Sequence, residues 1–533
     1  MGGRAIIILA AVFFLPFLGG VHLFDWDEIN FAECAREMLL TGNYGQVQIN
    51  FEPFWEKPPL FIWMQALSMQ IFGVGEYAAR FPNAICGIIT LLLLYRIGNR
   101  LHGKPFGWIW SIAYFGSLLP HLYFKSGIID PWFNLFIFLG FYLFIEAFWS
   151  QKRWLFFASG AVLGMAILTK GPVGLLIPGL VMIAYWVKMR LKWYVKPLDF
   201  IIVGLSSLIV TGLWFGYEIL QNGPWFVEQF ITYQIRLFST QDAGHGGFPG
   251  YHVVVLLFGC FPASVFAIPA LLRPQLEGDK DRDLRWWMAA LFWVVLILFS
   301  IVQSKIIHYS SMAYFPLTYL GATTIFKLIR EEKPLPGGLK WGLVSIGTLI
   351  SLAAIGAAVI GNNIEWIKPL LAKDPFALAN LEADVRWTGW ELIPGGVLGG
   401  WVVGLLVFGK RIISDKGISL LFVGTAIFLQ LGLFFFVGRV EGYSQRAAIE
   451  FYKTLQGKEV YVKTVGFKSY AHLFYSQKKP GGAPEQNDLE WLAKGAVDRE
   501  VYLVTKIHKA DRLRQYPELR EVFGENGFVG YAR

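Results

Sequence analysis

Three carboxylates follow directly after the first apolar run of the chain. Asp25, Asp27 and Glu28 lie within four residues of one another in HLFDWDEIN. A charge at bilayer depth costs roughly 2.5–3.5 kcal/mol on insertion scales, so acidic groups at the edge of a membrane segment usually face a cavity or a partner. Asp25 or Asp27 could instead cap the helix that follows. Capping accounts for one carboxylate, whereas three favour a site that uses acids.

Further ionisable residues stand in segments that the span pattern described below places on the same side of the membrane. They are Lys57 in FWEKPPL, Arg80 in EYAARFPN, Lys125 and Asp130 around KSGIID, Lys170 in LTKGPVGLL, His245 in QDAGHGGFPGYH, and Lys305 and His308 in QSKIIHYS. Loops on the outer side are ordinarily poor in Lys and Arg. Carboxylates beside these cations predict a site that handles a phosphate and a proton.

Several of these residues also have an ordinary structural interpretation. Asp130 precedes Pro131, and Asp at the N-cap with Pro at the first helical position is a common helix opening. Arg80 could anchor its span at the interface, and Lys170 could extend to the headgroups. His245 could be an ordinary loop histidine.

The composition is that of a polytopic membrane protein. The chain has 533 residues, of which 55% are hydrophobic and 16% charged, and its mean hydropathy is +0.48. A soluble domain carries about 25% charged residues. The net charge of +9 needs no nucleic-acid partner, because cytoplasmic membrane loops collect Lys and Arg. The three cysteines form no CxxC pair, so neither a zinc knuckle nor a disulfide framework is expected.

Apolar runs long enough to cross a bilayer recur along the chain, because a span needs about 20 apolar residues. Thirteen are identified: 5–23, 80–98, 106–123, 128–149, 154–169, 172–187, 199–220, 251–272, 286–304, 308–328, 340–361, 392–409 and 416–438. The first is interpreted as a retained span because it is long for a signal peptide and no clear cleavage site follows it. The segment 60–72 is short and is expected to lie in the interface.

Basic residues fall in alternate loops, which fixes one orientation by the positive-inside rule. With Arg4 in the cytoplasm, the cytoplasmic segments are 96–104, 152–153, 188–196, 273–285, 327–333 and 409–416. The first outer loop is then 24–79. It is expected to carry a second interfacial helix after Glu28, whose solvated face would be formed by Glu33, Arg36 and Glu37.

The two parts of the chain differ in character. Residues 1–439 are predicted to form the transmembrane domain, and 440–533 a small α/β domain on the outer face. Strands are expected at 458–465, 499–506 and 527–533, with helices at 444–455 and 508–516.

Five segments resemble, in order, the motifs of a known family. They are DWDEINFAECAREML, FWEKPPLFIW, EYAARFPN, IIDPW and LTKGPVGLLIP. They are similar to those of GT-C membrane glycosyltransferases related to dolichyl-phosphate-mannose protein mannosyltransferases, and especially of the bacterial lipid A aminoarabinose transferases. The resemblance implies about thirteen transmembrane helices, an outer C-terminal domain, and inverting transfer of a sugar from a polyprenyl-phosphate carrier.

The resemblance also implies roles for particular residues. Asp27 would be the catalytic base, with Glu28 beside it in the site, Asp130 as a second acidic position, and Asp25 left as a cap. The carrier phosphate would be held by Lys57, Arg80, Lys170 and Lys305, with His308 as a further substrate-binding residue. Glu56 and His245 could share a divalent metal. Ile29, Asn30 and Phe31 stand where the family often has Arg or Tyr, so the acceptor side differs.

These observations together predict an inverting glycosyltransferase. It would move a sugar from a polyprenyl-phosphate carrier to a hydroxyl or phosphate of lipid A, a glycan or a protein, on the outer face of a bacterial inner membrane. The absence of a Gly-rich nucleotide fingerprint agrees with a lipid-linked donor. The alternatives are a transporter or flippase of lipid-linked glycans, which needs polar groups near the midplane and usually internal repeats, and a non-catalytic envelope scaffold. The sequence leaves the sugar, the acceptor and the role of the C-terminal domain open.

Overall fold

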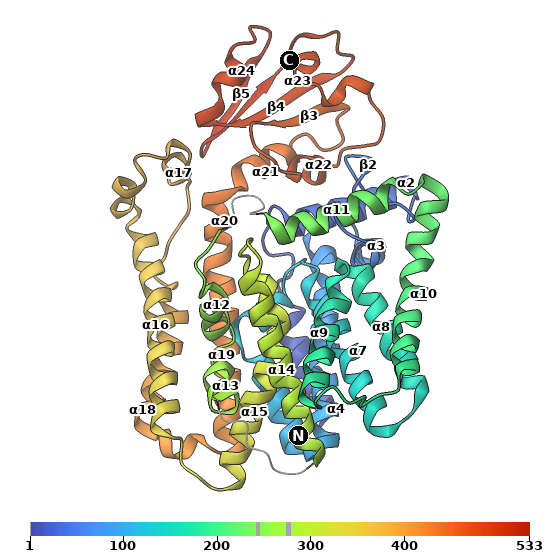
Figure 1. The fold of residues 1–533 in the computed structure, drawn as a ribbon. Coiled ribbons are helices and arrows are strands. Elements are labelled where there is room, and N and C mark those ends of the chain that lie inside the picture. Colours follow the sequence, from blue (N-terminus) through green and yellow to red (C-terminus); the bar gives the residue numbers. More distant parts are fainter. Residues whose placement is uncertain (1, 241–245, 273–278) are drawn as a thin grey trace.

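Long helices form a bundle, and a small mixed α/β domain covers one end of it (Figure 1). The computed structural model describes residues 2–240, 246–272 and 279–533. The bundle is built from α1 (Gly3–Phe14), α4 (Glu76–His102), α5 (Lys104–Phe115), α6 (Leu118–Tyr123), α7 (Asp130–Ser150), α8 (Arg153–Lys170), α9 (Val173–Lys188), α10 (Pro197–Asn222), α12 (Tyr251–Gly259), α13 (Ala263–Leu272), α14 (Asp279–Ile301), α15 (Tyr314–Arg330), α16 (Gly337–Asn362), α18 (Leu392–Ile412) and α19 (Asp415–Gly432).

The predicted apolar runs all contain helix. Within the described residues, six helical segments are long and apolar enough to cross a membrane: Glu76–His102, Asp130–Ser150, Pro197–Asn222, Asp283–Ile301, Gly337–Asn362 and Asp415–Ser444. Other runs are divided into shorter helices, as at α5 and α6 or α12 and α13, and the helix of the first run ends at Phe14. The prediction of a helical protein with several apolar spans is confirmed, and the count of thirteen stays a prediction.

The N-terminus and the basic α15–α16 connection lie at the end of the bundle opposite the C-terminal domain (Figure 1). This arrangement agrees with the alternation of basic loops. The basic segment 273–285 lies partly outside the described residues. We call the opposite end, which bears the C-terminal domain, the domain-bearing end.

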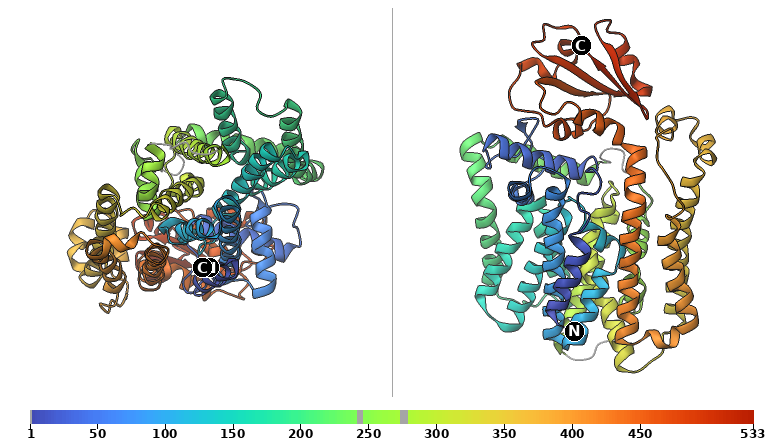
Figure 2. Two further views of the ribbon diagram at one scale, coloured as in Figure 1. Left: turned by 90° about the horizontal axis from the view of Figure 1, so that it is seen from below. Right: turned by 180° about the vertical axis from the view of Figure 1, so that it is seen from behind.

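Helices α2 (Asp27–Thr41) and α11 (Trp225–Ser239) lie across the domain-bearing end, roughly perpendicular to the bundle (Figures 1 and 2). Helix α3 (Leu60–Phe72) has the expected bounds, and a short hairpin, β1 (Gln48–Ile49) and β2 (Glu52–Pro53), joins α2 to it. The solvated face predicted for α2 is wrong: Glu33, Arg36 and Glu37 are all buried. They are covered because α2 is enclosed between α3 and helix α22 of the C-terminal domain.

The C-terminal domain carries a four-stranded sheet in the order β3-β4-β6-β5. Strands β3 (Val460–Val465) and β4 (Glu500–Lys506) are parallel, with Val460 opposite Glu500, whereas β6 (Phe528–Ala532) pairs antiparallel with both β4 and β5 (Arg520–Glu525). Helix α20 (Gly438–Ser444) leads into this domain, whose helices are α21 (Arg446–Lys453), α22 (Ala471–Ser476), α23 (Leu489–Lys494) and α24 (Asp511–Arg514). Helix α17 (Pro375–Asn380) lies in the loop between α16 and α18.

Three of these four strands were predicted, and β5 was missed. The helix expected over 508–516 contracts to a 3₁₀ turn, η7 (Ile507–Lys509), followed by α24. At the other boundary, α19 continues through a π-helical turn, η5 (Leu433–Val437), into α20, so the helical rod ends at Ser444. The predicted division at residue 440 therefore lies within a continuous helical segment.

Candidate active site

A cavity of about 660 Å³ opens between α2 and the domain-bearing end of the bundle. Segments far apart in the sequence contribute to it: the start of α2, the stretch around Glu56 and Lys57, the start of α7, the α8–α9 junction, α11, and the turn η2 (Ile307–Ala313) that precedes α15. The described residues of the predicted site that line it are Asp27, Glu28, Glu56, Lys57, Asp130, Lys170 and His308. The sequence-based grouping of these charges in one site agrees with this placement.

Asp27 is the first residue of α2, and its side chain is 39% exposed within the cavity. Its Oδ2 lies 3.9 Å from Nε2 of His308. The preceding residue, Trp26, has φ +73°, a conformation uncommon for any residue other than Gly. This reversal of the backbone brings the chain into α2 with Asp27 at the cavity.

Asp25 lines the cavity but is bonded to the C-terminal domain, and it does not cap α2. Its carboxylate accepts hydrogen bonds from the amide of Trp26, 3.0 Å away, and from Ser469 and the amide of Tyr470. Burial raises the pKa of Asp25, and these donors together with Lys506 only partly offset that rise. The cap interpretation is wrong because Trp26 occupies the N-cap position and makes no side-chain cap bond.

Glu28 is clamped by Arg80. The guanidinium donates from Nε to Oε1 at 2.8 Å and from Nη2 to Oε2 at 2.7 Å. The carboxylate also accepts from the amides of Phe24 and Gly127, at 2.9 and 2.5 Å. Burial tends to raise the pKa of Glu28, but Arg80 and these amides outweigh it and hold that pKa below its usual value.

The rest of the Arg80 guanidinium is also occupied. It donates to the backbone carbonyls of Leu18, Val21 and His22. Arg80 is buried and is not among the described residues that line the cavity. The structure therefore places it beneath the start of α2, where it ties α4 to the segment between α1 and α2.

Lys170 and Asp130 form an ion pair at the base of the cavity, with Nζ donating to Oδ1 at 2.6 Å. The Lys170 ammonium also lies 5.6 Å from the ring centroid of Tyr309 and 5.7 Å from that of Phe133. Asp130 is the first residue of α7 and makes no cap bond; Ile129 occupies the N-cap position. The helix-cap interpretation of Asp130 is therefore wrong.

Lys57 is held over the face of Tyr233 on α11, with its Nζ 5.1 Å from the ring centroid. The Arg236 guanidinium lies over the same ring at 5.1 Å. His308 is within electrostatic range of Lys57, Asp27 and the Lys170 pair. Positive groups from α11, α8 and the loop before α3 thus share one cavity with the Asp27 carboxylate.

Lys305 caps a helix. Its Nζ donates to the carbonyls of Phe299, Ser300 and Val302, at 3.1, 2.7 and 2.5 Å, which lie at the end of α14. Lysine commonly binds the last carbonyls of a helix in this way. Lys305 is not among the described lining residues of the cavity. Lys125 makes the same kind of contact at the end of α1, where it donates to Phe13 and Pro16.

Of the two predicted metal ligands, Glu56 and His245, the structure describes only Glu56. Glu56 lines the cavity, whereas His245 lies outside the described residues. No group of three or more His, Cys, Asp or Glu side chains in the described part of the chain is placed to hold a metal ion. Glu56 alone does not make a metal site.

Among the cavity residues that were not predicted from the sequence are Tyr233, Arg236, Tyr309 and Lys468. Arg236 is a cation between the predicted spans 199–220 and 251–272, in a segment that the alternation of basic loops places outside, so the rule that outer loops are poor in Lys and Arg could have identified it. Lys468 belongs to the C-terminal domain, and its Nζ lies 5.3 Å from the ring centroid of Trp26. No pattern near Lys468 indicates that its domain reaches the cavity.

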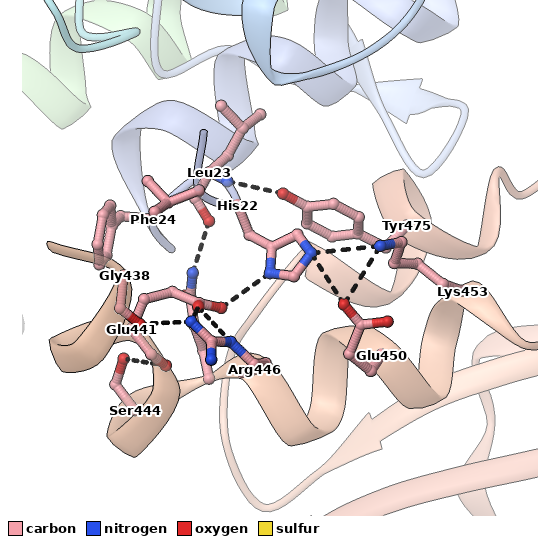
Figure 3. A network of polar contacts seen from close by, with 12 residues as sticks. His22, Leu23, Phe24, Gly438, Glu441, Ser444, Arg446, Glu450, Lys453 and Tyr475 are labelled. Carbon is pink, nitrogen blue, oxygen red and sulfur yellow. Dashed lines mark hydrogen bonds and ion pairs between the residues drawn. The ribbon is translucent and has the colours of Figure 1, made fainter. Parts of the chain in front are cut away.

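The segment before α2 is fixed to the C-terminal domain by a polar network around His22 (Figure 3). His22 Nδ1 lies 2.8 Å from Oε1 of Glu441 on α20, and its Nε2 lies 3.2 Å from Oε1 of Glu450 on α21. The amide of Leu23 donates to the hydroxyl of Tyr475 on α22 at 2.7 Å. The domain therefore helps to hold the residues that lead into Asp27.

A buried acidic cluster on α2 predicts a measurable dependence of stability on pH. The Glu37 carboxylate accepts hydrogen bonds from the backbone amides of Asn50 and Phe51, at 2.6 and 2.8 Å. Burial and the nearby Glu33 raise the pKa of Glu37 from 4.5 to about 9. Between these values the folded protein holds a proton that the unfolded chain has released, so this group makes stability fall as pH rises from 4.5 to 9. Glu37→Gln is expected to flatten that slope in thermal unfolding curves.

The control is Glu485→Gln, the same change at an exposed position. It is expected to leave the slope of unfolding temperature against pH as in the wild type. Equal slopes for Glu37→Gln and the wild type would contradict the assignment. A glutamine has one acceptor oxygen, so one of the amides of Asn50 and Phe51 loses its acceptor in Glu37→Gln. That loss lowers the stability at every pH but does not change how the stability depends on pH, which is why the slopes are compared.

Several known proteins are similar to this chain in sequence or in fold. A family model described as dolichyl-phosphate-mannose-protein mannosyltransferase matches residues 56–215. An undecaprenyl phosphate-α-4-amino-4-deoxy-L-arabinose arabinosyl transferase from Photorhabdus laumondii is 24% identical over 69% of this chain and 69% of its own. The corresponding transferase from Shewanella sediminis is 26% identical over 74% of this chain and 68% of its own.

The crystal structure of ArnT from Cupriavidus metallidurans bound to undecaprenyl phosphate aligns with a TM-score of 0.77. It does so over 99% of this chain and 97% of that one, at 18% identity. The chain is thus a multi-pass membrane protein with the fold of that transferase. In sequence it is similar to the aminoarabinosyl transferases and, over residues 56–215, to the protein mannosyltransferases, which confirms the resemblance found in the motifs.

Proposed function

We propose that this protein transfers a sugar, with inversion, from a polyprenyl-phosphate carrier to a hydroxyl or phosphate acceptor. The observation that carries the proposal is one cavity at the domain-bearing end holding the Asp27 carboxylate together with the ammonium groups of Lys57 and Lys170. The relatives that act on undecaprenyl-phosphate-linked aminoarabinose support a lipid-linked donor. The domain-bearing end would face the outside of a bacterial inner membrane, as the basic loops require.

The reaction divides into two charge movements. Asp27 takes the proton of the acceptor hydroxyl as the acceptor oxygen attacks the anomeric carbon. The bond from that carbon to the carrier phosphate breaks, and the phosphate leaves with additional negative charge. Cations preorganised in a site shielded from water stabilise such charge strongly. Lys57 fits this role because no carboxylate in the described part of the chain forms an ion pair with it, whereas Lys170 already neutralises Asp130.

The apolar part of the cavity suits the lipid. Phe133, Val173, Ile177, Phe299 and Val302, all from the bundle, are among the residues that line it. A polyprenyl chain would lie against them with its phosphate toward Lys57 and Lys170. The acceptor would enter from the side of Trp26 and Lys468. The sugar and the acceptor, whether lipid A, a glycan or a protein, are open to experiment.

The test is a transfer assay with purified protein in lipid nanodiscs. Undecaprenyl-phosphate sugars and a bacterial envelope extract are supplied, and new glycosylated products are identified by mass spectrometry. We expect a product that depends on both the carrier and the protein. In parallel, sealed vesicles report whether a labelled lipid-linked sugar crosses the membrane. Crossing without transfer would overturn the proposal in favour of a flippase.

Loss of the Lys57 ammonium should weaken carrier binding. A hydrogen bond to a charged group contributes about 1.5–3 kcal/mol, so Lys57→Ala is expected to raise the KM for the carrier roughly 10- to 100-fold with the fold kept. Lys479→Ala, at an exposed lysine that pairs with Glu459, is the control. An unchanged KM for Lys57→Ala would remove Lys57 from the phosphate site.

A further inference from the structure

A second hollow, of about 460 Å³, lies on the C-terminal domain where it meets the β1–β2 hairpin. Four cationic side chains line it: Lys463, Lys468, Lys478 and Arg512. The described residues that line it include no carboxylate; the other polar side chains of the lining are Asn50, Thr464, Ser469, Tyr470, His472 and Asn487. We call this hollow the basic pocket.

The basic pocket lies at the carboxyl ends of the parallel strands β3 and β4. Its floor is the end of β3, and its rim is the loop that leaves β3 at Gly466, which has φ +80°. Because β3 is parallel to β4, this loop stands at the carboxyl ends of two parallel strands. Ligands of α/β sheets commonly bind outside the carboxyl ends of such strands.

The cations of the basic pocket repel one another and are partly withdrawn from water. Burial and, to a smaller extent, nearby Lys463 lower the pKa of Lys478 to about 8, against the opposing effect of carboxylates outside the pocket. Asn50 accepts a hydrogen bond from Lys478 Nζ at 2.6 Å, which fixes the ammonium at the pocket wall. Four like charges gathered without a lining carboxylate are stabilised when an anion enters.

The basic pocket is connected to the active-site cavity through one side chain. Lys468 lines both, and its Nζ lies over the rings of Trp26 and Tyr470, at 5.3 and 5.6 Å. The neighbouring Ser469 bonds to Asp25, two residues before the proposed base. A molecule bound in the basic pocket therefore stands beside the side of the cavity through which an acceptor would enter.

We propose that the basic pocket binds a phosphate group carried by the acceptor, at a distance from the acceptor atom that reacts. Arginine and lysine side chains are the usual protein ligands of phosphate. The volume admits a phosphate together with the sugar ring that bears it. Assigning the bound group to the acceptor rests on the proposed function, whereas binding of a phosphorylated sugar does not.

The binding test uses the full-length protein in nanodiscs of zwitterionic lipid. Glucose 6-phosphate, inorganic phosphate and glucose are the probes, and binding is measured by calorimetry. We expect the two phosphate probes to bind and glucose not to bind. Lys463→Gln and Arg512→Gln are each expected to raise the Kd roughly tenfold or more, because a charge-assisted contact to phosphate is lost. Lys479→Gln, adjacent to Lys478 but outside the pocket, should leave the Kd unchanged.

The same experiment separates the possible sites and sources of the anion. Lys57→Ala acts in the active-site cavity and should not change the Kd of glucose 6-phosphate. Nanodiscs with anionic lipid should compete with the probe only if the pocket takes a lipid headgroup in place of a sugar phosphate, and that competition would overturn the acceptor assignment. Equal affinities of the wild type, Lys463→Gln and Arg512→Gln would overturn the pocket itself. Circular dichroism verifies that both variants retain the fold.

The transfer assay then tests the connection with the acceptor. For a phosphorylated acceptor, Lys463→Gln is expected to raise the acceptor KM about tenfold while kcat is kept, and for its dephosphorylated form to leave KM unchanged. An equal effect on both acceptors would contradict the proposal. If the wild type transfers no sugar at all, the proposed function fails, while phosphate binding that depends on Lys463 and Arg512 still stands by itself.

Discussion

Replacing Asp27 by Asn is expected to lower the transfer rate constant about 10²–10⁴-fold, the usual contribution of a positioned general base. The amide keeps the size and the hydrogen-bonding capacity of the side chain but cannot take a proton from the acceptor. Asp27 is in a position to act because it is partly exposed in the cavity and 3.9 Å from His308, while the neighbouring Glu28 is occupied by Arg80. The KM for the carrier should change little, since the phosphate contacts are made by other residues.

Asp25→Asn is the matched control. It makes the same chemical change two residues earlier, at a carboxylate that bonds to the C-terminal domain. We expect a small effect on kcat, because an asparagine oxygen can still accept the amide hydrogen of Trp26. The measurement is single-turnover transfer with saturating carrier, followed by mass spectrometry of the product. Equal rates for the wild type and Asp27→Asn would exclude Asp27 as the base and direct attention to Asp130.

The sequence predicts which side of the membrane carries the site, but it does not separate cations that line a cavity from cations that hold backbone. Lys57, Lys170 and His308 line the cavity, whereas Lys305 binds carbonyls at a helix end. Both groups share the same unusual location in outer segments. The carbonyl partners of Lys305 are only a few residues away, yet they become acceptors solely because α14 ends there.

The burial of the acidic residues on α2 could not be predicted because distant segments cover them. The sequence predicts a solvated face with Glu33 and Glu37 because apolar and charged residues of α2 fall on opposite sides of a helix. In the structure α22, more than 400 residues later, packs over α2, and Glu33 pairs with Arg36 at 2.6 Å. The strand β5 was missed because it is exposed, not because a distant segment covers it. It is an edge strand with exposed, charged residues and lacks the apolar alternation that revealed β3, β4 and β6.

Arg80→Met is expected to destabilise the protein by roughly 3–5 kcal/mol, because removal of one partner leaves the other charge buried and uncompensated. Glu28 would retain only its two amide donors in a largely buried position. The carbonyls of Leu18, Val21 and His22 would lose their donor as well. Because these residues lead into α2, transfer should fall together with stability. Chemical unfolding in mixed micelles measures the first effect.

Two further variants separate a structural clamp from a phosphate ligand. Replacing both partners, Glu28→Gln with Arg80→Met, should restore part of the stability, since no charge is then left buried. Arg514→Met, at an exposed arginine paired with exposed Asp511, should change stability little. A phosphate-binding Arg80 predicts the reverse pattern: a raised KM for the carrier, unchanged stability, and no rescue by the second substitution. The geometry favours the clamp, because the contacts of Arg80 already occupy Nε, Nη1 and Nη2 and all of them lie beneath α2.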